Sequence, residues 1–450
     1  MAKKLLSLFL CFALFLCGCS AQNAGPGADT NISSSSVQEG ELEIFCLESA
    51  NIFYGMIAFR EQFPDIRLSV QKFKTSSEME DVLINRINTK DAPDIVIFDY
   101  STTLDFEKLA QKEAFYPLTD FIKEDGDFTL ENYLPAAVNR VQTDEEPYFL
   151  PFSLMPVINY SPQSLMETLQ IEQGTTTLEE YFLALQNHDQ QNAQDAYTLS
   201  FFRQSQLFGE ENIPIVPLVL GVADIDIAQE LHSPDFKERL KLVVDFSILI
   251  ELQDQKAQNA YRTNWSAVNW ENTFSISQSS CDILRNITMY ISAYRPYFKE
   301  DVGYFVLPTL RDPQKTSALL SAWGSVLADC ENPRAAYDFL RCVMDHYEIH
   351  YRNGLSRWST PVCKEKIYEI VESYQSQSWK LRDNTVVNPI TDATAENILK
   401  LYHSIESFQF PNPKLADFID TEFYDYNQGT ASYDMCYEKF LNKMRLYQEE

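Results

Sequence analysis

Apolar and polar positions follow two different periods over residues 42–99. Residues 42–47, 66–73 and 95–98 form short apolar or alternating runs, which predict strands. Residues 53–63 and 76–90, which separate these runs, carry apolar side chains at helical spacing. Strands separated by single helices favour a parallel sheet with right-handed crossovers, so the sequence predicts an α/β fold.

The carboxyl ends of the predicted strands indicate where a ligand would bind. In open parallel sheets, ligands occupy the crevice beyond these ends. The rule singles out three connecting segments, residues 48–54, 74–77 and 99–103. We expect a binding site to draw on side chains from these segments.

Helical and strand patterns return later in the chain. Thr177 and Glu180 have the spacing of a capping box, and Asn332 followed by Pro333 fits a helix start. The pattern predicts further helix over 201–262 and at 432–450, with strands near Phe274 and over 303–310. It also predicts a turn at 159–162, where the letters read NYSP, and a helix from about Pro162.

The amino terminus has the pattern of an export signal. Two lysines precede an apolar run over Leu5–Leu16, which is too short to remain as a membrane-spanning helix. The letters LCGC that follow resemble a bacterial lipobox, which implies that residues 1–18 are removed and that Cys19 carries lipid. An ordinary signal cut after Ala21 is the alternative. Residues 19–40 have little apolar content and are expected to be a disordered tether.

Composition limits the partners and the chemistry. The formal net charge of −29 argues against a nucleic-acid partner, and 45% apolar residues supply ample material for a core. No CxxC pair is present and the chain has five histidines, so no metal site is expected. The cysteines beyond the signal can form disulfides or remain buried thiols; they are Cys46, Cys281, Cys330, Cys342, Cys363 and Cys436.

Seven features match, in order, a known family. They are the lipobox, FREQFPDI, DAPDIVIFD, LAQKEAFYPLTDFI, YFLPFSLMPVINYSPQSL, VLPTLRDPQ followed by AWGSVLADCENPRAAYDFL, and the terminal helix ending in LYQEE. The chain resembles the carbohydrate-type (family 1) solute-binding lipoproteins of bacterial ABC importers. The resemblance implies a monomer without a cofactor, anchored by lipid on the outside of the cell membrane, which captures a sugar or oligosaccharide and delivers it to a permease.

The resemblance also implies the fold, a two-lobed arrangement like the type II periplasmic binding proteins. Each lobe would be a mostly parallel sheet flanked by helices, and crossing segments would form the hinge. The expected first lobe comprises residues 41–148 and 271–322, and the second comprises 149–270 and 323–450.

Sugar capture needs flat apolar faces and planar polar groups. The candidates placed by the resemblance are Tyr54, Asp99, Tyr100, Tyr160, Trp270, Ser279, Trp323 and Trp358. Packing explains many of them equally well, because aromatic side chains are more often in a core than at a ligand. Tyr100, Trp270 and Trp323 suit a pocket wall or hinge packing, Tyr160 could support the predicted turn, and Asp99 could bond a hydroxyl or cap a helix starting near Thr102.

Two other functions remain open from sequence. An exported hydrolase is disfavoured because the chain has no GxSxG, no HExxH and no Gly-rich phosphate loop, so we expect no catalytic residues. A surface sensor or adhesin that keeps the binding fold is the second alternative.

Overall fold

The computed structural model describes residues 40–48, 50, 52–143, 147–194, 201–203, 215–225, 227–264, 274–277, 302–347, 360–376, 378–380, 386–387 and 389–449. These residues belong to one compact unit, Gln38–Glu450.

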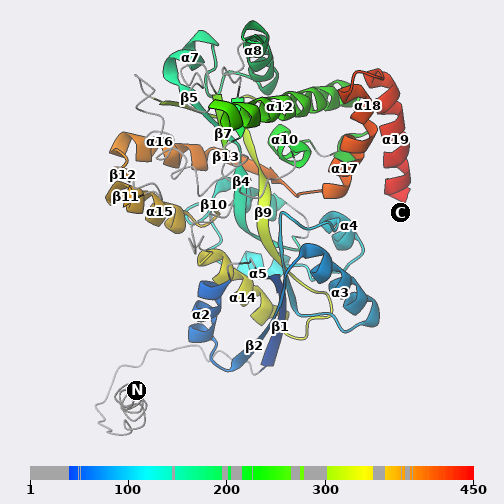
Figure 1. Ribbon diagram of the computed structural model, residues 1–450. Helices are drawn as coiled ribbons and strands as arrows, with labels where there is room; N and C mark the ends of the chain where they lie inside the picture. The colour runs from blue at the N-terminus through cyan, green and yellow to red at the C-terminus, as the bar shows by residue number, and fades with distance from the viewer. Residues whose placement is uncertain are drawn as a thin grey trace, which may run out of the picture. The chain divides into compact units, whose positions relative to one another are not determined.

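A parallel sheet with two helical crossovers opens the unit, as the sequence predicts (Figure 1). Its strands are β1 (Gly40–Leu47), β2 (Ile66–Phe73) and β3 (Ile95–Asp99), and β1 pairs in parallel with both others. The connecting helices are α2 (Phe53–Gln62) and α3 (Ser76–Thr89). The buried apolar run of β3 is typical of a central strand covered on both faces.

Four later strands extend this sheet to the order β10-β4-β9-β3-β1-β2, with β13 paired to β9. They are β4 (Leu150–Pro156), β9 (Thr316–Val326), β10 (Thr360–Pro361) and β13 (Ile405–Gln409). Every residue of β4 and β9 is buried. These two strands therefore lie at the centre of the sheet with both faces covered.

A second sheet has the order β6-β7-β5-β8. Its strands are β5 (Ile158–Pro162), β6 (Phe201–Arg203), β7 (Phe274–Ser277) and β8 (Val302–Val306). The predicted turn at 159–162 is wrong, because these residues continue β5 and pair with β8. Pro162 is the last residue of β5, and α7 (Gln163–Thr168) follows it directly.

The remaining elements are helices and one short ribbon. The ribbon pairs β11 (Trp379–Lys380) with β12 (Val386–Val387). The helices are α4 (Phe106–Gln111), α5 (Thr119–Glu124), α6 (Pro135–Thr143), α7 (Gln163–Thr168), α8 (Leu178–Gln191), α10 (Ile215–Ala223), α11 (Ile227–Glu230), α12 (Phe236–Asn264), α14 (Pro333–Asp345), α15 (Lys364–Ser376), α16 (Asp392–His403), α17 (Pro413–Glu422), α18 (Tyr424–Asn427) and α19 (Tyr433–Glu449).

Two predicted helix starts are confirmed. Thr177 and Glu180 form the capping box of α8, in which each side chain accepts a hydrogen bond from the backbone N–H of the other residue. The Asn332 side chain caps α14, and Pro333 is the first residue of that helix. No helix in the described ranges has both the length and the apolar character needed to cross a membrane. The described ranges contain free cysteines at Cys46, Cys330, Cys342, Cys363 and Cys436, whereas Cys281 lies outside them.

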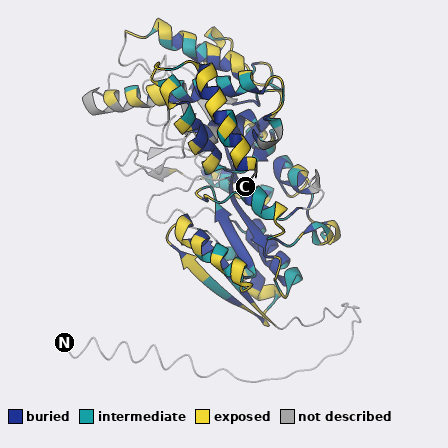
Figure 2. Ribbon diagram, turned by 90° about the vertical axis from the view of Figure 1, so that its right-hand side faces the viewer, coloured by how far each residue is buried: buried dark blue, intermediate teal, exposed yellow. Residues whose placement is uncertain are grey.

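The buried apolar residues of the unit form two hydrophobic clusters. Figure 2 shows that the strands of the large sheet are mostly buried, whereas many of the helices have an exposed side. The first core lies around β1, β3, β4 and β9 and includes side chains from α6, α14, α15 and α16. The second core is built mainly by α8, α10, α12, α17 and α19. We call the elements around these cores the first lobe and the second lobe.

The predicted lobe boundaries differ from this packing. Residues 333–408, which were expected in the second lobe, contribute Leu340, Ile398 and Phe408 to the first core. Strands β7 and β8, expected in the first lobe, pair instead with β5 in the second sheet.

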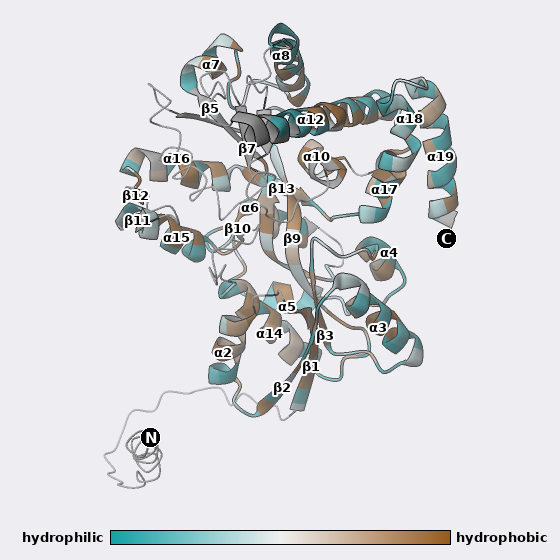
Figure 3. Cartoon of the chain, viewed as in Figure 1, coloured by the Kyte–Doolittle hydropathy of each residue, from teal (hydrophilic) through white to brown (hydrophobic). Residues whose placement is uncertain are grey.

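Apolar residues are concentrated along the inner strands, and polar residues lie on outward faces such as that of α8 (Figure 3).

Strands β4 and β9 contribute to both cores. Leu154 and Leu320 belong to the first core, whereas the next residue of β4, Met155, and the preceding residue of β9, Leu319, belong to the second. Successive side chains of a strand point to opposite faces. The two strands therefore run through the junction of the lobes as shared structure.

The contact between α2 and α14 gives a test of the first lobe. A Cβ on Gly55 would lie 2.6 Å from the Cα of Val343, which is too close for backbone to accommodate. We expect Gly55→Ala to lower the free energy of unfolding by about 1–3 kcal/mol, as overpacking does. Gly126→Ala is the matched control, because nothing lies within 4 Å of its Cβ position. Urea unfolding measures both, and equal midpoints for the two variants would contradict the packing described.

Candidate functional site

A cavity of about 390 Å³ lies where the two cores meet. The first lobe supplies the start of α4, and the second lobe supplies α10, α17 and the end of α19. Residues 409–412, which connect β13 of the first lobe to α17 of the second, form another wall. The lining residues are Asp105, Phe106, Glu107, Lys108, Gln111, Leu220, Gly221, Ile225, Ile227, Gln409, Phe410, Pro411, Asn412, Leu415, Tyr447 and Gln448.

The loop between β3 and α4 is held by a buried carboxylate. Glu80 of α3 is 5% exposed and accepts hydrogen bonds from Thr102 Oγ1 at 2.7 Å, Thr103 N at 2.6 Å and Thr103 Oγ1. The hydroxyl groups of Ser76 and Ser101 lie 2.5 Å apart. These bonds join two of the three segments singled out by the sequence, so the start of α4 has a fixed position at the edge of the sheet.

Asp99 and Tyr100 begin this loop. Asp99 accepts hydrogen bonds from the backbone N and the hydroxyl of Ser101, at 2.9 and 2.5 Å. The predicted cap near Thr102 is wrong, because α4 begins at Phe106 and its cap is Asp105. Tyr100 donates its backbone N–H to Ser321 of β9 at 3.0 Å, while its ring packs against the second core. Tyr100 thus contacts both lobes.

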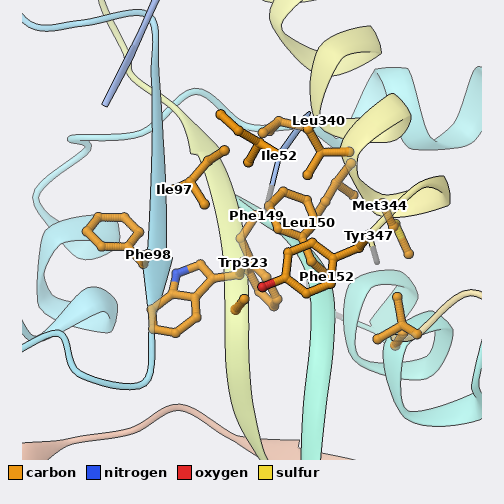
Figure 4. Packing of buried hydrophobic residues seen from close by; sticks show 14 of the residues in the cluster. Ile52, Ile97, Phe98, Phe149, Leu150, Phe152, Trp323, Leu340, Met344 and Tyr347 are labelled. Carbon is orange, nitrogen blue, oxygen red and sulfur yellow. The ribbon is translucent and has the colours of Figure 1, made fainter. Parts of the chain in front are cut away.

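Aromatic rings form one wall of the cavity. Phe106 and Phe410 stack with ring centroids 4.7 Å apart, and Trp323 lies behind them, with centroids 5.9 and 5.5 Å away. Trp323 also stacks on Phe98 at 5.5 Å (Figure 4). Its side chain is 0% exposed, so of the two roles expected from sequence the structure gives it the packing role. Trp323 supports the wall but does not line it.

Polar groups of both lobes meet at the other side of the cavity. The Tyr447 hydroxyl donates to Asp105, and Lys108 donates from Nζ to the Tyr447 carbonyl oxygen. Burial and the bond to Asp105 raise the pKa of Tyr447, so the phenol remains protonated. Gln409 donates from Nε2 to Asp224 at 2.6 Å, and Asn412 caps α17 by accepting from Leu415 N at 3.0 Å.

The other sequence candidates do not join this site in the described structure. Tyr54 lies in the first turn of α2, partly buried, with its ring edge-on to Phe53 at 5.3 Å. Tyr160 belongs to β5, and its side chain is outside the description. The remaining predicted residues lie outside the described part of the chain; they are Cys19, Trp270, Ser279 and Trp358.

Sequence reasoning missed the residues that line the cavity. Asp105 and Phe106 could have been found, because they start the helix that follows a carboxyl strand end and Asp is a preferred cap. Phe410 and Tyr447 carry no such signal, since they reach the cavity from segments more than 300 residues away.

The chemistry of the lining suits binding of a neutral polar solute. Flat aromatic faces can cover C–H surfaces, while carboxylate, ammonium and amide groups can bond hydroxyls. Among the described residues that line the cavity there is no His, Cys or Ser to form a nucleophile and base pair. Among the described residues, no cluster of three His, Cys, Asp or Glu side chains could hold a metal ion.

The Glu80 bonds can be tested directly. Glu80→Ala leaves the Thr102 hydroxyl and Thr103 N–H without their acceptor, which is expected to cost about 1–3 kcal/mol of unfolding free energy. Amide hydrogen exchange in residues 101–106 should accelerate. Asp81→Ala, the adjacent exposed carboxylate on α3, is the control and should leave exchange in this loop unchanged. Identical exchange in both variants would show that Glu80 does not hold the loop.

Comparison with known proteins places the chain in a family. The sugar-binding protein MalE from Xanthomonas citri is 12% identical with a TM-score of 0.59, and the match covers 91% of this chain and 99% of that one. A family 1 extracellular solute-binding protein from Alicyclobacillus acidocaldarius is 10% identical with a TM-score of 0.53, and the match covers 91% of this chain and 98% of that one. The galacto-N-biose/lacto-N-biose I-binding protein of the ABC transporter from Bifidobacterium longum is 12% identical with a TM-score of 0.50, and the match covers 92% of this chain and 98% of that one. These likenesses confirm the two-lobed fold. No curated protein sequence matches the chain. Because residues 48–346 match the sequence profile described as bacterial extracellular solute-binding protein, the chain belongs to that family.

Proposed function

We propose that this protein captures a sugar or oligosaccharide in the cavity between its lobes and delivers it to the permease of an ABC importer. The observation that carries the proposal is the composition of the cavity: an aromatic wall of Phe106 and Phe410 faces polar groups from both lobes. A pyranose presents the complementary surfaces, with C–H groups on its faces and hydroxyls around its rim.

Capture would work through the hinge that the crossing segments form. A solute that contacts Asp105 or Lys108 of the first lobe and Gln448 of the second makes its full set of contacts only when the lobes are together. Differential affinity for the closed arrangement is what shifts the population toward it. No covalent step is needed, and we propose no enzymatic activity.

The similar solved structures support the ligand class. One is described as a sugar-binding protein and another as the binding protein of an ABC transporter in complex with lacto-N-biose. A sensor or adhesin that retains the fold would share the cavity but would not need a permease. The family is extracellular, so the protein works outside the cytoplasm.

Anchoring by lipid completes the proposal. The basic start, the short apolar run and LCGC predict processing before Cys19 and lipid on that residue. A monomer held by its amino terminus could then deliver solute to a permease in the same membrane.

A panel of sugars tests the proposed ligand class. Thermal unfolding of Gln38–Glu450 is measured with mono- and oligosaccharides, and with amino acids and peptides as controls. A sugar at a hundred times its dissociation constant should add about 2.7 kcal/mol to the free energy of unfolding. Stabilisation by peptides or amino acids alone would contradict sugar capture.

The aromatic wall is tested with the sugar found in that panel. Phe410→Leu keeps an apolar side chain but removes the flat face, and should weaken binding by about 0.5–1.5 kcal/mol. Phe53→Leu is the control, because Phe53 is 60% exposed on α2 and does not line the cavity. Titration calorimetry measures both, and equal affinities for both variants would exclude stacking on Phe410.

Lipidation is tested separately at Cys19. The wild-type chain expressed in a bacterium should yield a mature protein that begins at a lipidated Cys19 and sediments with membranes. Cys19→Ser should lose labelling by palmitate and its membrane association. An unmodified amino terminus at Gln22 in the wild-type protein, found by mass spectrometry, would instead identify an ordinary signal.

A further inference from the structure

We propose that Tyr447 is a latch that holds the two lobes together before any solute binds. The proposal deepens the proposed function, because the latch borders the cavity in which we place the solute. Tyr447 lies in the last turns of α19, near the carboxyl end of the chain. It contacts α4, which belongs to the other lobe.

Tyr447 is firmly part of the second lobe. Its side chain is 5% exposed and belongs to the second core with Phe440 and Met444 of the same helix. Its ring meets Phe418 of α17 edge-on, with centroids 5.6 Å apart. Because this packing holds Tyr447 in the second lobe, its bonds to α4 connect the two lobes to each other.

The contact with the first lobe has three components. The phenol hydroxyl donates to the carboxylate of Asp105, and the Lys108 ammonium donates to the Tyr447 carbonyl oxygen. The same ammonium lies 3.6 Å from the centroid of the Tyr447 ring, within the range of a cation–π interaction. Asp105 and Lys108 belong to the first turn of α4 and its cap, and the adjacent Phe106 is in the first core.

These contacts join the two lobes, so separation of α4 from α19 would break them. They join residues 339 and 342 positions apart in sequence, and all three side chains line the cavity. Hydrogen bonds to charged groups shift an equilibrium by about tenfold to a hundredfold each. The latch would therefore favour closure in the absence of solute, and a bridging solute would add to the same equilibrium.

Solution scattering from Gln38–Glu450 without solute tests the latch, because this unit is compact by itself. Tyr447→Phe removes the hydroxyl but keeps the ring, and should increase the radius of gyration relative to wild type. Lys108→Met removes the other two components of the contact and should do the same, and the double variant, which lacks all three, should open at least as far as either single variant. Leu446→Ala is the matched control, since Leu446 is the preceding residue of α19 and is 64% exposed. Circular dichroism confirms that each variant is folded.

Unchanged scattering for Tyr447→Phe and Lys108→Met, with both variants folded, would overturn the latch. For a sugar that binds the wild type, Tyr447→Phe should weaken the affinity by about tenfold, because closure is less favourable. Tighter binding would overturn the latch by showing that Tyr447 competes with the solute. If no sugar binds the wild-type protein but scattering still shows that the variants open, the result supports the latch and contradicts the sugar proposal.

Discussion

The antiparallel pairing of β4 with β9 is the constraint on which the two-lobed structure depends. Leu150 pairs with Gly324 at one end and Pro156 pairs with Ala318 at the other, and the hydroxyls of Ser153 and Ser321 lie 2.8 Å apart between them. Both strands are buried along their whole length and supply side chains to both cores. Any movement of one lobe against the other must therefore bend these strands and residues 409–412, which makes them the hinge.

The same pairing positions the cavity. It holds Trp323 of β9 against Phe98 of β3, and Trp323 in turn supports Phe106 and Phe410. The flat wall is thus an extension of the first core into the space between the lobes. Glu80 fixes the loop that leads to the wall, so bonds within the protein hold the first-lobe side of the cavity in place. A preformed surface reduces the entropy that binding must overcome.

Much of the fold could be predicted from the sequence, because period-2 and period-3.6 patterns are local. The strands β1 to β3, the capping box at Thr177 and the start of α14 at Asn332 are examples. The lobe boundaries and most of the residues that line the cavity could not be predicted from the sequence. Whether residues 333–408 pack with one lobe or the other depends on contacts distant in sequence, and an aromatic such as Trp323 has the same local pattern in a core as at a ligand.

The most direct test of sugar capture between the lobes is amide hydrogen exchange of Gln38–Glu450 with and without a saturating sugar. A sugar bound between the lobes should protect residues 99–111 of the first lobe together with residues 409–415 and the end of α19. Protection confined to one lobe, or to surfaces such as the exposed face of α2, would contradict capture in the cavity where the two cores meet.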